Sequence, residues 1–352
     1  MTKTLCAGLL PLTLLLSSYS ACAAGPYYAQ ALQVRHDARG FTPWALNANG
    51  QIAGAAWGAL RQRAMVSGAN GQDMLAVRTP LDGDHDAWAT GITDSGRAVG
   101  WLRSLWSGDQ GFYTDPKGRK WTPVLAPTWA TRAVFAGVNG NGLATGYASL
   151  KASGQAHAIL GPLEQVAPID LGTLGGSSSW GYAVDSSGRV VGESDTGNSN
   201  SPRQAFITGP GGAAMQALES TPSYRSAARA ISDTGWVAGW RQADAAAVSM
   251  AFVQHPSIGL RVLSLPNGGT GEALGVDAQG HVVGWTRNAQ GDWTAFVTEA
   301  EGGTVVDLNA VTVGLPRRSR LGWGFAINAR GQIAAADTDG KAYLLCPTPG
   351  CL

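Results

Sequence analysis

A short turn motif occurs seven times along the chain, and this repetition constrains the fold more than any other feature. Each copy consists of a short polar residue, two further residues and a glycine. The polar side chain can hydrogen-bond the backbone two residues on and the glycine accepts a positive φ, so each copy predicts a β-hairpin turn. The glycines are Gly50, Gly96, Gly142, Gly188, Gly235, Gly280 and Gly331. The polar residues are Asn47, Thr93, Asn139, Asp185, Ser232, Asp277 and Asn328.

The glycines recur every 45 to 51 residues, which is close to the length of a four-stranded propeller blade. An aliphatic residue precedes each polar residue, and the position before it is always small. Strands that crowd around a central axis need such small side chains, so we interpret these seven strands as the innermost ones. The sequence thus predicts an all-β fold, a single seven-bladed β-propeller of four-stranded blades over residues 25–352. The small residues are Ala45, Gly91, Gly137, Ala183, Ala230, Gly275 and Ala326.

The last repeat ends after its third strand, at residues 342–346, where a fourth strand is still required. Residues 27–34 precede the first inner strand, as a fourth strand does in the other repeats. We therefore expect this N-terminal strand to complete the last blade by pairing beside residues 342–346. Such closure would join the two ends of the chain non-covalently and cover a strand edge that would otherwise be exposed.

Composition agrees with this fold class. Glycine makes up 49 of the 352 residues and only 14% of the residues are charged, which favours turns over long solvated helices. Hydrophobic residues make up 44% of the chain and include 13 tryptophans, enough apolar surface for a packed core. These values exclude both a disordered chain and a collagen-like one.

The first 24 residues have the features of an export signal. Lys3 supplies the positive start, residues 9–16 form an apolar run too short to span a bilayer, and Ala-Cys-Ala-Ala ends the segment with a cleavage site. We predict a signal peptide over residues 1–24 and a periplasmic or extracellular protein without a transmembrane segment. Lipoprotein processing at Cys22 is the less favoured alternative, because Tyr19 stands where such signals usually have an aliphatic residue.

Cleavage after residue 24 would remove Lys3 and no acidic residue, so 24 basic and 24 acidic side chains would remain. Nucleic-acid binding needs a basic surface, so this balance excludes nucleic acid as an expected partner. Two cysteines would also remain, Cys346 and Cys351. No second Cys or His pair accompanies them to complete a zinc site, so we predict that they form a disulfide.

The fourth repeat resembles a known family. Residues 171–176 read Leu-Gly-Thr-Leu-Gly-Gly, and residues 204–206, beyond the turn, read Gln-Ala-Phe. This segment is similar to the HAF-type extracellular repeat, whose third strand typically begins His-Ala-Phe; here only His157 keeps the histidine. The resemblance is strong over residues 165–210 and weaker over most of 41–346. It implies a bacterial exported repeat protein with a propeller-like fold, and it implies no settled activity or catalytic residue.

Residues that could carry out catalysis or hold a metal are few. No nucleophile elbow of the Gly-x-Ser-x-Gly type is present. The cluster of Asp82, Asp84, His85 and Asp86 could chelate Ca²⁺, but Thr93 stands where an EF-hand-like loop needs a glutamate. We interpret the cluster as a solvated loop. We therefore predict no catalytic residue, no metal and no cofactor.

Aromatic residues gather at the start of the inner strands and at the end of the second strands. In an up-and-down blade these two places lie together at the end opposite the seven turns, which we call the distal face. Flat rings with a hydrogen-bonding edge suit sugar rings and peptide segments alike, although such residues can also pack between blades as core. We predict that this face binds the ligand, and its most exposed contacts are predicted to be Trp88, Trp101, Trp240 and Trp285. Further contacts are expected from Trp44, Tyr147, Trp180 and Trp323.

Three function classes remain open. The first is an exported, non-catalytic binding module that presents the aromatic face to a glycan or protein ligand. The second is a propeller-fold carbohydrate-active enzyme, a glycosidase or lyase, where glycoside hydrolysis would need two neighbouring carboxylates. The third is a structural module of an envelope or secreted assembly. We favour the first class over an enzyme because the sequence places no two of the candidate acids together, namely Asp82, Asp84, Asp86, Glu193 and Glu219. We expect the protein to be a monomer.

Overall fold

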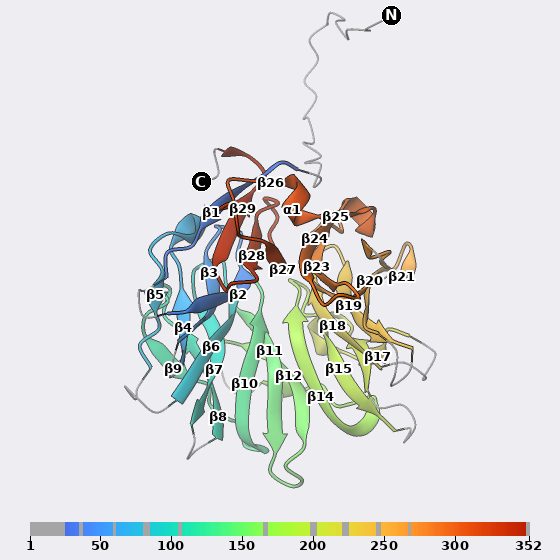
Figure 1. The fold of residues 1–352 in the computed structure, drawn as a ribbon. Coiled ribbons are helices and arrows are strands. Elements are labelled where there is room, and N and C mark those ends of the chain that lie inside the picture. Colours follow the sequence, from blue (N-terminus) through green and yellow to red (C-terminus); the bar gives the residue numbers. More distant parts are fainter. Residues whose placement is uncertain are drawn as a thin grey trace, which may run out of the picture.

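The described residues form seven sheets around a central axis, and the predicted all-β seven-bladed propeller is confirmed (Figure 1). In six of the sheets four consecutive strands are joined in antiparallel order. The innermost strand of each sheet contacts the innermost strand of the next, which closes the ring. The computed structural model describes residues 25–34, 38–58, 61–79, 85–104, 108–164, 168–197, 203–219, 225–243, 248–266 and 269–349.

The first three blades follow one another along the chain. Blade 1 contains β2 (Gly40–Leu46), β3 (Ile52–Trp57), β4 (Gln62–Val66) and β5 (Leu75–Ala76). Blade 2 contains β6 (His85–Ile92), β7 (Ala98–Ser104), β8 (Gly108–Thr114) and β9 (Trp121–Pro123). Blade 3 contains β10 (Ala130–Val138), β11 (Leu143–Leu150), β12 (Ala156–Pro162) and β13 (Ile169–Asp170).

The next three blades have the same order. Blade 4 contains β14 (Gly175–Val184), β15 (Val190–Thr196), β16 (Arg203–Ile207) and β17 (Gln216–Ala217). Blade 5 contains β18 (Arg225–Ile231), β19 (Val237–Gln242), β20 (Met250–His255) and β21 (Gly259–Val262). Blade 6 contains β22 (Thr270–Val276), β23 (Val282–Arg287), β24 (Trp293–Thr298) and β25 (Val305–Asp307). Short helical segments occur at Ala69–Gly71, Pro210–Gly212, Ala300–Gly302 and, as α1, Leu308–Val311.

The seventh sheet has five strands instead of the four expected. Its order is β26, β1, β29, β28, β27, and its strands are β26 (Thr312–Val313), β1 (Tyr27–Ala31), β29 (Ala342–Cys346), β28 (Ile333–Asp337) and β27 (Leu321–Ile327). β1 pairs antiparallel with β29, from Tyr28 opposite Cys346 to Ala31 opposite Tyr343. The additional strand β26 pairs in parallel with β1 on its other side. β26 directly follows α1, and these two elements occupy the extra length of the last and longest repeat interval.

The turns have the conformation that the motif requires. All seven motif glycines adopt a positive φ, between 71° and 96°. At five turns the polar side chain accepts hydrogen bonds from the backbone N–H groups two and four residues on, as Asn47 does from Asn49 and Gln51. Local side-chain chemistry therefore determines where each hairpin reverses.

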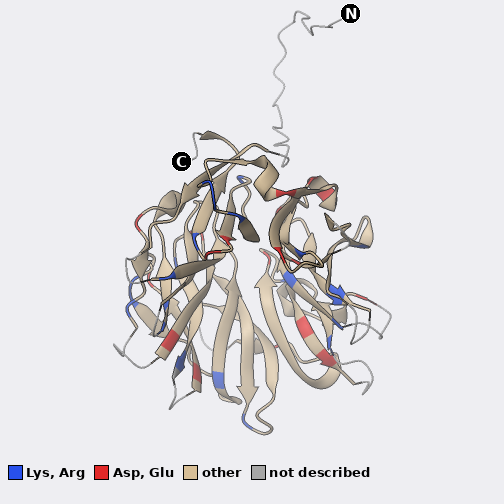
Figure 2. Ribbon diagram, viewed as in Figure 1, with Lys and Arg blue, Asp and Glu red and all other residues tan. Residues whose placement is uncertain are grey.

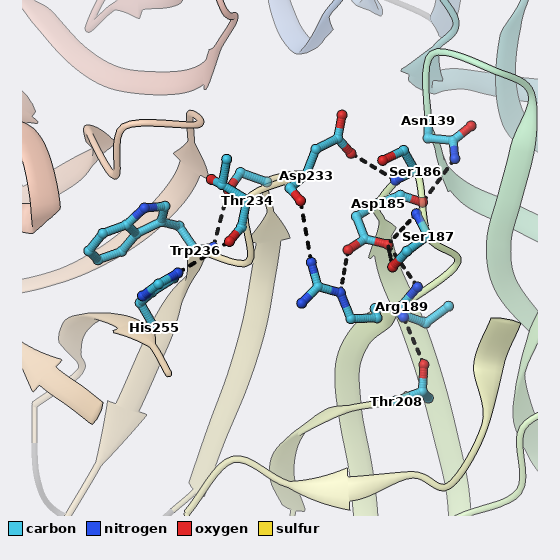
Figure 3. A network of polar contacts seen from close by, with 12 residues as sticks. Asn139, Asp185, Ser186, Ser187, Arg189, Thr208, Asp233, Thr234, Trp236 and His255 are labelled. Carbon is cyan, nitrogen blue, oxygen red and sulfur yellow. Dashed lines mark hydrogen bonds and ion pairs between the residues drawn. The ribbon is translucent and has the colours of Figure 1, made fainter. Parts of the chain in front are cut away.

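The same polar residues also connect neighbouring blades. Asn47 Nδ2 donates to Thr93 O at 2.8 Å, and Asn139 Nδ2 donates to Asp185 O at 2.9 Å. Asn328 Nδ2 donates to Asn47 O at 2.9 Å, so the last turn is linked to the first. We call these bonds the turn network, and Figure 3 shows the part around Asp185. The network holds the blades together at the end of the propeller opposite the distal face.

Small residues are required where the inner strands meet. A Cβ atom on Gly137 would lie 2.2 Å from the carbonyl oxygen of Tyr182 in the next inner strand. The second strands have the same constraint at Gly100, where a Cβ atom would lie 1.9 Å from the carbonyl oxygen of Trp88. Both positions therefore exclude any larger residue, as the crowding inferred from the sequence requires.

The core lies between the blades and repeats with them. The third strand of every blade contributes one large apolar side chain that is no more than 1% exposed: Met65, Phe112, Ile159, Phe206, Phe252, Phe296 and Tyr343. Each such side chain contributes roughly 1.5–3 kcal/mol when it is removed from water. All seven blades are therefore stabilised by a large buried side chain at the same position of the third strand.

Several predictions concern residues outside the described ranges. These residues include the signal peptide over 1–24 with Cys22, and also Asp82, Asp84 and Cys351. Cys346 is buried and disulfide-bonded, and its pairing with Cys351 stays a prediction. Within the ranges that the structure describes, no helix has the length and apolar character needed to cross a membrane.

Candidate ligand-binding face

The predicted aromatic residues occupy equivalent places in the blades. Trp88, Trp180 and Trp323 each stand five residues before the polar residue of their turn. The residues Trp101, Tyr147, Trp240 and Trp285 each follow the small residue of the second strand. In blade 2 the register pairs Trp88 directly with Trp101. These side chains therefore lie in the half of each blade that is farther from the turns.

The first aromatic cluster lies on blades 2 and 3. The Trp88 and Trp101 rings stack with centroids 4.0 Å apart, and the guanidinium carbon of Arg103 lies 5.0 Å from the Trp101 centroid. Asp109 holds this guanidinium, accepting from Arg103 Nε at 3.0 Å. Tyr147 Oη donates to the other Asp109 oxygen at 3.5 Å. Burial raises the pKa of Tyr147, so its hydroxyl remains a hydrogen-bond donor at neutral pH.

The second cluster lies on blade 4. The guanidinium carbon of Arg203 lies 4.2 Å from the centroid of Trp180. Arg203 also forms ion pairs with Glu193 at 3.1 Å and Asp195 at 2.9 Å. Tyr182 Oη donates to Glu193 Oε1 at 2.9 Å. Burial, followed by the neighbouring Glu193 carboxylate, raises the pKa of Tyr182, so this phenol does not serve as a base at neutral pH.

The third cluster lies on blades 6 and 7. The Trp285 and Trp293 centroids are 4.6 Å apart, and the Trp293 and Trp323 centroids are 5.2 Å apart. The guanidinium carbon of Arg287 lies 5.2 Å from the Trp293 centroid. Trp293 was not among the predicted residues, because it starts a third strand, where no other repeat has a tryptophan. The three tryptophans come from different strands, and only the fold brings them together.

The remaining two predicted residues stand apart from these clusters. Trp44 is 43% exposed, and its ring meets Phe325 edge-on at 5.4 Å. Trp240 is partly buried, and no described residue accepts a hydrogen bond from its Nε1 atom, which is itself buried. Of the eight predicted aromatic residues, only Trp44 is more than about one third exposed. The predicted face therefore consists of separate half-buried clusters and not of a continuous exposed ring.

A polar cluster connects the inner strands of blades 4 to 6. The Arg229 guanidinium lies over the Tyr182 ring at 4.7 Å. Burial raises the pKa of Glu272; the Arg229 charge lowers it and the Glu193 charge raises it, and the net direction is upward. This cluster was not predicted, since Tyr182, Arg229 and Glu272 belong to the inner strands of three different blades.

The acidic residues considered for catalysis are not brought together as a pair. Asp82 and Asp84 lie outside the described residues. The others have separate partners. Asp86 accepts from the backbone N–H of Gln62, and Glu193 contacts Arg203 and Tyr182. Glu219 forms an ion pair with Arg241. Among the residues that the structure describes, no group of three His, Cys, Asp or Glu side chains could hold a metal ion.

Charged residues are spread over all the blades, with no face of one sign in this view (Figure 2). The cations that stand out are the arginines of the three clusters, because each lies over a tryptophan ring. In such an Arg–Trp pair the guanidinium lies over one face of the ring and brings hydrogen-bond donors to an apolar surface. The arrangement can therefore bind a flat ligand that has an apolar face and polar edges.

Comparison with known proteins shows the fold and no family. No protein-family model matches the chain, and no curated protein matches it. Among solved structures, an oligogalacturonate lyase from Vibrio parahaemolyticus is 10% identical, with a TM-score of 0.60 over 92% of this chain and 94% of that one. YCF48, solved bound to D1 peptide, is 13% identical, with a TM-score of 0.54 over 92% and 97% of the chains.

A third structure similar to this chain belongs to a study of two prolyl endopeptidases. It is 12% identical, with a TM-score of 0.54, and the match covers 88% of this chain and 50% of that one. At these identities all three similarities concern the fold alone. Propellers of this shape thus occur in proteins with different activities.

Proposed function

We propose that this protein is an exported, non-catalytic binding module whose distal face binds glycan chains. The observation that carries the proposal is the Arg–Trp pair, which occurs at the distal half of blades 2, 4 and 6. Sugar rings stack on tryptophan through their apolar C–H faces and accept hydrogen bonds at their edges. Three such pairs on one propeller suit a ligand with repeated units.

The same proposal includes export of the protein and its membership of the HAF-type repeat family. The signal-like residues 1–24 support a periplasmic or extracellular location, and the similarity of residues 165–210 to the HAF-type extracellular repeat agrees with it. The Cys346–Cys351 disulfide would suit such an oxidising location. We also propose that β1 closes the ring, which its pairing with β29 supports.

An enzyme is the second candidate, and the geometry favours it less. The oligogalacturonate lyase with the same fold shows that a propeller of this size can carry such an activity. In this chain the Glu193 carboxylate is occupied by Arg203 and Tyr182, and Glu219 is occupied by Arg241. Carboxylates held in this way are less available to a substrate than free ones.

The test is a binding measurement on residues 25–352 with a panel of neutral and acidic polysaccharides. Trp101→Leu removes a stacking ring but keeps an apolar side chain, so affinity is expected to fall about fivefold, which corresponds to ~1 kcal/mol. Trp121→Leu is the matched control, since this half-buried tryptophan belongs to the fourth strand of the same blade. If Trp101→Leu binds like the unaltered protein, or if no polysaccharide of the panel binds, the proposal is wrong.

A further inference from the structure

The tryptophan cluster of blades 6 and 7 differs from the other two in its arginines. Arg287 is exposed at the end of β23, and its Nε donates to the backbone oxygen of Gly291 at 3.1 Å. Arg320 is exposed just before β27, and its guanidinium donates to Thr294 Oγ1 at 3.0 Å. Among the described residues neither arginine forms an ion pair with a carboxylate. Both guanidinium groups thus keep donors for an external anion.

In the other two clusters the arginine forms ion pairs with carboxylates of the protein. Arg103 is paired with Asp109, and Arg203 is paired with both Glu193 and Asp195. In these clusters a carboxylate directly opposite the arginine on the neighbouring strand neutralises the guanidinium charge. A bound anion would therefore compete with a fixed carboxylate there, whereas no described carboxylate competes at Arg287 and Arg320.

The two unpaired arginines lie beside one apolar surface. Arg287 lies over the Trp293 ring and is its direct partner across the β23–β24 ladder. Arg320 donates to Thr294 Oγ1, and Thr294 follows Trp293 in β24, so the two guanidinium groups contact neighbouring residues of one strand. Asp292, in the hairpin between these strands, is hydrogen-bonded to Asn288 at 3.1 Å. A sugar ring against Trp293 would place its acidic substituent next to the Arg287 guanidinium, and Arg320 adds a second cation at the next residue of β24.

Resting on the proposed function, we propose that this surface, the blade 6–7 patch of Trp285, Trp293, Trp323, Arg287 and Arg320, binds anionic glycans. The tryptophans provide the stacking surface. The two arginines select a carboxylate or sulfate, since a planar guanidinium matches these groups with two parallel hydrogen bonds. The patch thereby gives the propeller its preference among glycans, and the other two clusters add contacts that depend less on charge.

The experiment compares two forms of one polymer on residues 25–352. The first is alginate, a uronate polymer, and the second is alginate after reduction of its carboxyl groups to hydroxymethyl groups. We expect at least about tenfold tighter binding of alginate at low salt, and a loss of this preference as sodium chloride screens the charges. Dextran sulfate against dextran repeats the comparison for sulfate.

Variants locate the site. Arg287→Gln and Arg320→Gln should each weaken alginate binding about fivefold to tenfold, without changing the affinity for the reduced polymer. Lys117→Gln removes one exposed charge near the turns of blade 2 and is the control, with an expected change below about twofold. Trp293→Leu should weaken binding of both polymers.

The outcomes separate this inference from the proposed function. Equal affinity for the two alginates, or a preference that survives in the Arg287→Gln, Arg320→Gln double variant, overturns the blade 6–7 patch and leaves glycan binding standing. If neither anionic polymer binds while neutral members of the polysaccharide panel do, the blade 6–7 patch is likewise overturned and glycan binding stands. Failure to bind any polysaccharide overturns both proposals.

Discussion

At the residue scale, Glu272 shows how the fold alters a single group. Its carboxyl belongs to an inner strand and is largely buried, with the Arg229 cation and the Glu193 carboxylate as charged neighbours. Burial raises the pKa of Glu272 more than Arg229 lowers it. Because the pKa in the folded state exceeds the ordinary value, ionisation of this group opposes folding.

This cost has a defined dependence on pH. It is fully present above the raised pKa of Glu272 and is relieved as pH falls through that value toward the ordinary pKa of 4.5. Glu272→Gln should therefore raise the melting temperature at pH 8, and the gain should vanish near pH 4.5. Glu299→Gln, an exposed change in the same blade, is the control. Thermal melts at several pH values decide this, and a gain that persists at acidic pH would contradict it.

Residue patterns predicted the small positions well and the clusters poorly. Gly137 and Gly275 were recognisable because the same register is small in all seven repeats, and the backbone contacts at both explain why. Trp293 and Arg229 were not recognisable as parts of a site, since their partners come from other strands or blades. A repeat pattern shows what all the blades share, whereas a binding site depends on how particular blades differ.

At the scale of elements, each turn serves its own hairpin and also its neighbour. Asn328 Oδ1 accepts from two backbone N–H groups of its own turn, while Nδ2 donates to Asn47 O across the blade boundary. The first role was predictable from local chemistry. The second was not, because it depends on the distance between two turns that lie far apart in the sequence.

One substitution removes the donor of this side chain and keeps its acceptor. Asn328→Asp keeps the acceptor oxygen for the turn and loses both bonds of Nδ2, to Asn47 O and to Gln332 Oε1, so a buried carboxylate oxygen would face these two oxygens. We expect the free energy of unfolding to fall by about 2 kcal/mol at neutral pH. Asn49→Asp, which removes an exposed donor to Asp94 O, should cost well under half as much. Denaturant titrations of both variants test this, and equal losses would count against a separate role for the turn network.

At the scale of the whole molecule, the seventh sheet brings the two ends of the propeller together. Its third strand pairs with β1, whose Tyr27 is buried in the same core cluster as Leu321 and Tyr343. The prediction placed residues 27–34 beside residues 342–346, but the fifth strand β26 and the helix α1 were not foreseen. The longer last repeat interval marked where extra chain occurs, without showing what it forms.

Removal of β1 tests the closing role proposed for it. A chain that starts at residue 35 should melt at least about 10 °C lower than one that starts at residue 25, because it exposes the edge of β29 and loses the buried Tyr27. A synthetic peptide of residues 25–34 should restore part of the loss when added. The role would be refuted by an unchanged melting temperature in the shortened chain.

The pairing of β1 with β29 also has a consequence for the order of folding. Each of the other six blades consists of consecutive strands and can form as soon as its own segment is available. The seventh joins the first strand of the propeller to the last, so it requires closure of a loop that contains nearly the whole domain. An incomplete chain would therefore hold several formed blades with an open gap, and the domain would become resistant to proteolysis in one late step.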